Sequence, residues 1–161
     1  MAAQRRGSLV ARSVAVLALV VGLLLGAAPA GWAVGTPQDL PRAVVLEFHT
    51  SLADFGDAVG EGPFVWATNG CSTPNIKELA KWNHLFVHAC TRHDFAYDNF
   101  GHGGGLETPN EPRRAAVDAQ LCTDMYGICA PLSWLKAAEC RLVASARYTV
   151  VRKVGGIAYY Y

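Results

Sequence analysis

The sequence lacks several features that mark common classes of protein. It contains no internal repeat, no low-complexity tract and no alternating apolar and polar run long enough to predict a strand. Its longest apolar run, residues 14–28, is shorter than the ~20 residues that a membrane-spanning helix needs. These absences exclude a repeat protein and a largely β fold, and they argue against a membrane anchor.

Positive charge is scarce over most of the chain. The whole sequence has 14 Lys+Arg and 13 Asp+Glu, but three of the arginines, Arg5, Arg6 and Arg12, lie near its start. Without these three, 11 basic residues face 13 acidic ones. No basic stripe remains to displace the counterions of a phosphate backbone, so we expect no nucleic-acid partner.

The beginning of the chain predicts a secretory signal peptide over residues 1–33. The three arginines precede the apolar run, and the small residues of Ala28-Pro29-Ala30 or Gly31-Trp32-Ala33 follow it as cleavage sites. The remaining residues, 34–161, are enough for one domain with a real core. The sequence therefore predicts a secreted, extracellular protein of one domain.

All five cysteines lie in the predicted mature chain, at positions 71, 90, 122, 129 and 140. An exported protein meets an oxidising compartment, where disulfides are the default. Five cysteines form at most two bridges, and 15 pairing schemes remain open because spacing alone does not choose among them.

Helical periodicity dominates the mature chain and predicts a mostly α fold, a compact bundle of a few helices. We expect helices over Arg42–Val59, over Ile76–Asn99 with a break near Asn83, and from Pro112 or Arg113 to Ile128. Ser133 is expected to cap a fourth helix that Gly155-Gly156 ends.

One segment concentrates the chemistry. Residues 84–99 hold three of the five histidines, and His93 is followed directly by Asp94. Adjacent side chains on a helix point about 100° apart, so these two cannot serve each other. Asp118 lies within an apolar stripe of the next predicted helix, where an acid is costly unless it is paired. It is our candidate partner for His93, and a paired histidine has the properties of a general base.

The spacing around His93 resembles that of the bacterial and fungal secreted phospholipase A2 family. The family pattern Cys-x-x-His-Asp-Phe-Gly-Tyr-x-Asn is matched by Cys90-Thr-Arg-His-Asp-Phe-Ala-Tyr-Asp-Asn99. The family's later aspartate is matched by Asp118, followed by Asp124-Met-Tyr-Gly-Ile-Cys129. The resemblance extends over Trp66 to Cys140 and involves two helices and four cysteines.

The resemblance implies a small disulfide-stapled helical bundle in which two long antiparallel helices carry the active site. It implies a calcium-dependent phospholipase A2 that hydrolyses the sn-2 ester of glycerophospholipids at a membrane or micelle surface, and we expect a monomer. His93 would be the base and Asp118 its partner. The other implied residues are the calcium ligands Asp94, Asn69 and Gly70, the substrate contacts Tyr97, Phe95 and Trp66, and the disulfides Cys71–Cys90 and Cys129–Cys140.

Two alternatives remain open. The family position matched by Asn69 is usually an aspartate, so one negative charge is missing and calcium affinity is expected to be weaker. A catalytically weak phospholipase-like binding module is therefore one alternative. The other is a zinc hydrolase that uses His84 and His88, which share a helical face but lack the glutamate of the metalloprotease motif. Cys122 is left over and is expected to be a buried free thiol.

Overall fold

The computed structural model describes residues 35–71 and 77–161, and the predicted signal peptide lies outside these ranges. The described residues form helices and no strand, which confirms the mostly α prediction. No helix within these ranges is long and apolar enough to cross a bilayer. The elements are η1 (Pro37–Asp39), α2 (Leu40–Phe48), α3 (Leu52–Asp57), α4 (Lys77–Ala80), α5 (Asn83–Phe100), α6 (Glu111–Cys129), α7 (Trp134–Val154) and α8 (Gly156–Tyr160).

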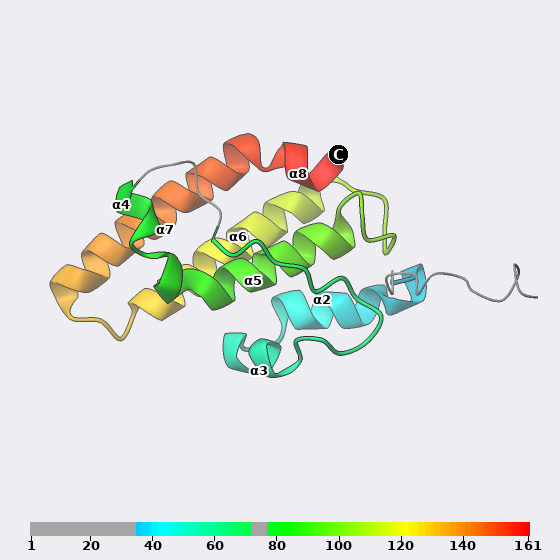
Figure 1. The fold of residues 1–161 in the computed structure, drawn as a ribbon, viewed down its shortest axis with the longest axis horizontal. Helices are drawn as coiled ribbons and strands as arrows, with labels where there is room; N and C mark the ends of the chain where they lie inside the picture. Colours follow the sequence, from blue (N-terminus) through cyan, green and yellow to red (C-terminus); the bar gives the residue numbers. More distant parts are fainter. Residues whose placement is uncertain (1–34, 72–76) are drawn as a thin grey trace, which may run out of the picture. The chain divides into compact units, whose positions relative to one another are not determined.

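Three long helices form the centre of the fold. Helices α5 and α6 run antiparallel and are joined by the loop of residues 101–110, and α7 packs along α6 (Figure 1). Asn110 caps α6, since its side chain accepts a hydrogen bond of 2.9 Å from the backbone N–H of Arg113. Helices α2 and α3 pack against α5. The central pair α5 and α6 is therefore covered from two directions.

The segment predicted as one helix over Arg42–Val59 is two helices, and the prediction of a single helix is wrong. Helix α2 ends at Phe48, and α3 begins after Ser51, whose backbone is extended (φ −61°, ψ 156°). The Ser51 hydroxyl accepts a hydrogen bond of 3.1 Å from the N–H of Asp54. This is an N-cap, which stops one helix and starts another although the apolar periodicity continues across it.

Tyr159, on the short helix α8, belongs to the core, a role that the sequence does not indicate for it. Tyr159 is fully buried, and its ring lies 5.1 Å from the ring of Tyr97. Gly155 permits this approach, because a Cβ there would lie 2.7 Å from the Tyr97 hydroxyl oxygen. The C-terminal turn is thereby packed directly onto α5.

Two disulfides staple the bundle, Cys71–Cys90 and Cys129–Cys140, the pairing that the resemblance implies. The first fixes the loop before α4 to the middle of α5, one turn from His93. The second joins the end of α6 to α7. Cys122 is a free thiol and is half-buried, and burial raises its pKa.

Candidate active site

His93 and Asp118 meet between the two antiparallel helices. The Nε2 atom of His93, on α5, lies 2.9 Å from Oδ1 of Asp118, on α6. Asp118 is completely buried and His93 is 8% exposed. Burial by itself raises the pKa of Asp118, but hydrogen bonds from His93, Arg152 and Tyr97 outweigh it and lower that pKa below its usual value. An ionised Asp118 accepts the Nε2–H proton of His93, which leaves Nδ1 as the basic nitrogen.

A second donor on α5 reaches the same carboxylate oxygen. The hydroxyl of Tyr97 donates to Oδ1 of Asp118 at 2.7 Å, and its ring lies 4.2 Å from the imidazole of His93. Burial and the bond to Asp118 both raise the pKa of Tyr97, so this hydroxyl stays protonated and remains a donor. Tyr97 is predicted to contact substrate; in the structure its hydroxyl is hydrogen-bonded to the carboxylate of Asp118.

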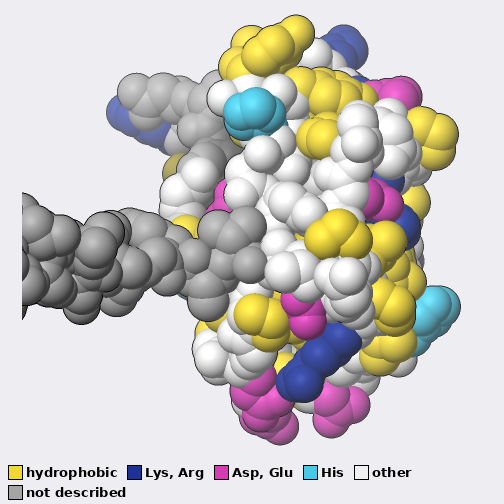
Figure 2. All heavy atoms as spheres, turned by 90° about the vertical axis from the view of Figure 1, so that its right-hand side faces the viewer, with side chains coloured by type: hydrophobic (Ala, Val, Ile, Leu, Met, Phe, Trp, Pro, Cys, Tyr) yellow, Lys and Arg dark blue, Asp and Glu magenta, His cyan; other side chains and the backbone are white. Residues whose placement is uncertain are grey.

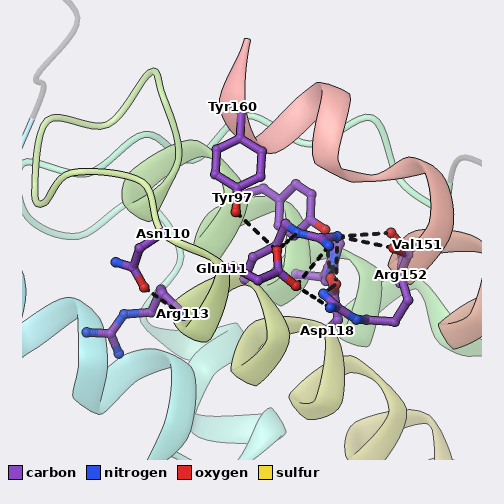
Figure 3. A network of polar contacts seen from close by, with 10 residues as sticks. Tyr97, Asn110, Glu111, Arg113, Asp118, Val151, Arg152 and Tyr160 are labelled. Carbon is purple, nitrogen blue, oxygen red and sulfur yellow. Dashed lines mark hydrogen bonds and ion pairs between the residues drawn. The ribbon is translucent and has the colours of Figure 1, made fainter.

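The other oxygen of Asp118 is held by two arginines that sequence reasoning missed (Figure 3). Arg152, near the end of α7, donates to Oδ2 at 2.7 Å, and Arg114, on α6, donates to it at 3.3 Å. Arg114 precedes Asp118 by four residues, a helical spacing that could have revealed it. No local signal points to Arg152, because it comes from another helix.

Asp94 faces a different part of the chain from His93. Its Oδ2 atom accepts hydrogen bonds from the hydroxyl of Thr68 at 2.7 Å and from the N–H of Asn69 at 3.1 Å. Burial raises the pKa of Asp94, although these hydrogen bonds oppose the increase. The loop with Asn69 and Gly70 is thus folded onto this carboxylate, and the positive φ of Gly70 (68°) suits a glycine there.

His93 and Asp94 line the same cavity, which has a volume of about 410 Å³. Its polar part comes from two helices and one loop: His93, Asp94, Tyr97, Arg147, Asn69 and Gly70. Its apolar wall comes from α6 and from the end of α7 and α8: Leu121, Met125, Val150, Val151, Val154 and Ala158. A cavity with a few polar groups at one end and an apolar wall fits a ligand of the same mixed character.

Two expected substrate contacts are placed in the core instead. Phe95 is 1% exposed and Trp66 is half-buried, and their rings lie 4.6 Å apart within an aromatic cluster that includes Phe55 and Phe64. Neither residue is part of the cavity wall. The aromatic cluster lies on the other side of α5, against α3 and the loop that follows it.

The profile of the prokaryotic phospholipase A2 family matches residues 45–155, which include every residue of the cavity wall except Ala158. The chain belongs to this family. No curated protein sequence matches it. Membership in the prokaryotic phospholipase A2 family indicates a lipid-hydrolysing enzyme, and the pairing of His93 with Asp118 lies within the matched region.

The histidines of the zinc alternative lie elsewhere in this phospholipase A2 fold. His84 and His88 are both exposed, and at 100° per residue His84 points opposite to His93. In the described ranges no three His, Cys, Asp or Glu side chains are grouped in a way that would hold a metal ion. Calcium also accepts backbone and amide oxygens as ligands, so a calcium site does not need three such side chains.

Proposed function

We propose that this protein is a secreted, calcium-dependent phospholipase A2 in which His93 is the general base and Asp118 its partner. The observation that carries the proposal is the buried contact of 2.9 Å between His93 Nε2 and Asp118 Oδ1, at the wall of a cavity that is otherwise largely apolar. A base at one end and an apolar wall beside it suit a substrate with an ester next to acyl chains.

The chain's own residues account for the proton transfers of ester hydrolysis. Nδ1 of His93 takes a proton from water while the water oxygen bonds to the ester carbonyl carbon. Asp118 holds the imidazole in the Nε2–H tautomer and stabilises its charged form, as in other histidine–carboxylate pairs. The carbon–oxygen bond of the ester then breaks, and His93 returns the proton to the departing alcohol oxygen. The products are a fatty acid and a lysophospholipid.

Calcium fits the residues around Asp94. Burial raises the pKa of this carboxyl, so its charge is incompletely compensated by Thr68 and Asn69, and a cation would compensate it. Asp94, the side chain of Asn69 and the carbonyl of Gly70 offer the oxygen ligands that calcium prefers. Bound calcium would polarise the ester carbonyl and hold the phosphate.

An apolar rim supports action at a lipid surface. Val154 lines the cavity and is 56% exposed, and Ile157 and Tyr161, in and just after α8, are 74% and 93% exposed. Figure 2 views the end of the fold at which α8 lies, and hydrophobic side chains extend from its top down its right-hand side while acidic ones gather along its lower edge. With residues 1–33 as a signal peptide, the enzyme would meet its substrate outside the cell, as a monomer.

The test is hydrolysis of a diacyl phospholipid in mixed micelles by the mature chain, with calcium titrated and chelator as the control. We expect release of the sn-2 fatty acid that depends on calcium. Activity that is lost on chelation and restored by zinc but not by calcium would instead favour the hydrolase based on His84 and His88. Binding of lipid without any release at millimolar calcium would favour the binding module.

A further inference from the structure

The two oxygens of the Asp118 carboxylate accept hydrogen bonds from different kinds of side chain. Oδ1 receives Nε2 of His93 and the hydroxyl of Tyr97, both from α5. Oδ2 receives only arginines among the described residues, Arg114 from α6 and Arg152 from α7. One oxygen therefore serves the base, and the other is fixed by groups that do not face the reaction.

The two arginines are themselves held in place by Glu111, at the start of α6. Glu111 accepts hydrogen bonds from Arg114 at 2.8 and 3.1 Å, from Arg152, and from the hydroxyl of Tyr160 at 3.1 Å. Hydrogen bonds from Arg114, and then from Arg152, lower the pKa of Glu111 to about 2. Figure 3 shows Glu111, Arg152, Tyr160 and Asp118 drawn together from α6, α7 and α8.

The charges of this network cancel. Two carboxylates, Asp118 and Glu111, face two guanidinium groups, Arg114 and Arg152. The two arginines therefore bring no uncompensated positive charge to the network, and we assign them a geometric role at Oδ2 of Asp118. A fully buried carboxylate with one oxygen unsatisfied would rotate or admit water, because an unpaired buried charge is costly.

We propose that Arg152, with Arg114, is a positioning residue of the reaction, which holds Asp118 in the orientation that presents Oδ1 to His93. This inference rests on the proposed function. The end of α7 then contributes to the active site as well as to the cavity wall. Arg152 acts through Asp118 and does not touch the reacting atoms.

The test compares Arg152→Gln and Arg152→Lys with the wild-type chain, and uses Lys153→Gln, an exposed neighbour on the same turn, as the matched control. The readouts are kcat and KM for micellar phospholipid, and the tautomer of His93 from the nitrogen-15 shifts of its imidazole. We expect Arg152→Gln to lower kcat about 10- to 100-fold with KM within about twofold, since orientation of a base's partner contributes to a step worth 10²–10⁴-fold. We expect Arg152→Lys to recover most of the loss.

The tautomer measurement separates this inference from the proposed function. The wild-type imidazole is expected to be in the Nε2–H form and the Arg152→Gln imidazole in a mixture of both forms, whether or not the protein hydrolyses lipid. A wild-type tautomer in Arg152→Gln would overturn the inference. A loss of kcat that only follows a lowered folded fraction, measured by circular dichroism in the same buffer, would also overturn it. Absence of hydrolysis by the wild-type chain would count against the proposed function alone.

Discussion

Helix α6 carries two buried aspartates, Asp118 and Asp124, and each binds one of two adjacent residues of α5. Asp118 receives His93, and Asp124 receives Arg92 through two hydrogen bonds. Both contacts tie α5 to α6. Only the first one borders the cavity, since neither Arg92 nor Asp124 is part of its wall.

The two pairs differ in what surrounds them. Arg92 also donates to the carbonyl of Thr50 at 2.7 Å and lies 5.6 Å from the ring of Phe55, so this pair is enclosed by the α2–α3 side of the fold. The Asp118 pair adjoins open volume and includes an imidazole, which can take a proton as a general base. Burial and ion pairing alone therefore do not mark a catalytic carboxylate. The histidine partner and the neighbouring cavity distinguish Asp118 from Asp124.

The largest expected effect is the loss of activity on replacing His93, the member of the Asp118 pair that lies on α5. His93→Gln should lower hydrolysis about 10²- to 10⁴-fold because the base is lost, while the free energy of unfolding changes little. The measurements are release of fatty acid from micelles and urea denaturation. A His93→Gln variant with full activity would remove His93 from the mechanism and make the two pairs equivalent.

The next prediction concerns replacement of each of the two aspartates of α6 by asparagine. Asp118→Asn should lower kcat strongly, since the amide cannot stabilise an imidazolium. Asp124→Asn should instead lower the free energy of unfolding by about 3 kcal/mol, because it leaves the charge of Arg92 buried. The kcat of the folded Asp124→Asn protein should be unchanged. Equal losses of kcat in both variants at matched folded fraction would contradict the division between the pairs.

Much of this arrangement could be predicted from the sequence because it is local to helices. His93, Asp94 and Tyr97 follow a motif on one helix, and Asp118 stands out as an acid in an apolar stripe. Arg152 and Tyr159 could not be predicted, because their contacts depend on how the end of α7 and α8 return to α5 and α6. The cap at Ser51 was overlooked because apolar residues continue at helical spacing on both sides of it.

The placement of Phe95 and Trp66 shows a second limit. Aromatic residues beside a catalytic motif suggest substrate contact, but Phe95 lies two positions after His93, about 200° around the helix. That rotation directs it into the core, where the ring of Trp66 packs against it at a tilt. Periodicity applied to α5 alone would have separated Phe95 from Tyr97, although it could not have located Trp66.

A third prediction concerns the proposed calcium ligands at the cavity. Asn69→Asp places a second carboxylate beside Asp94, and it should lower the calcium concentration for half-maximal activity roughly tenfold, since ligand charge is one determinant of calcium affinity. Asn110→Asp is the matched control, because Asn110 caps α6 and aspartate caps a helix equally well. Calcium titrations of hydrolysis and calorimetry measure the effect. Unchanged calcium dependence in Asn69→Asp would place the metal elsewhere.

The smallest expected effect is on stability, and it concerns Glu47, a buried acid near the pair of Arg92 and Asp124. Glu47, on α2, is 1% exposed, and neither of its carboxyl oxygens has a hydrogen-bond partner among the described residues. Burial raises the pKa of Glu47 well above its usual value of 4.5, although the charge of Arg92 opposes this and that of Asp124 adds to it. Arg113 is the other charged group that acts on it, and it also lowers the pKa.

The raised pKa of Glu47 gives a pH dependence of stability with a defined sign. Above pH 4.5 the folded state keeps a proton on Glu47 that the unfolded state releases, so stability falls as pH rises towards the folded pKa. The slope is at most about 1.4 kcal/mol per pH unit, and Glu47→Gln removes it.

Asp118 acts in the opposite sense, because its lowered pKa gives stability that is lost as pH falls. Subtracting the wild-type stability from that of Glu47→Gln at each pH cancels the Asp118 contribution, and we expect this difference to grow as pH rises above 4.5. A difference that is flat, or that shrinks, would mean that Glu47 is ionised in the fold and paired with Arg92, which would make the second pair a triad.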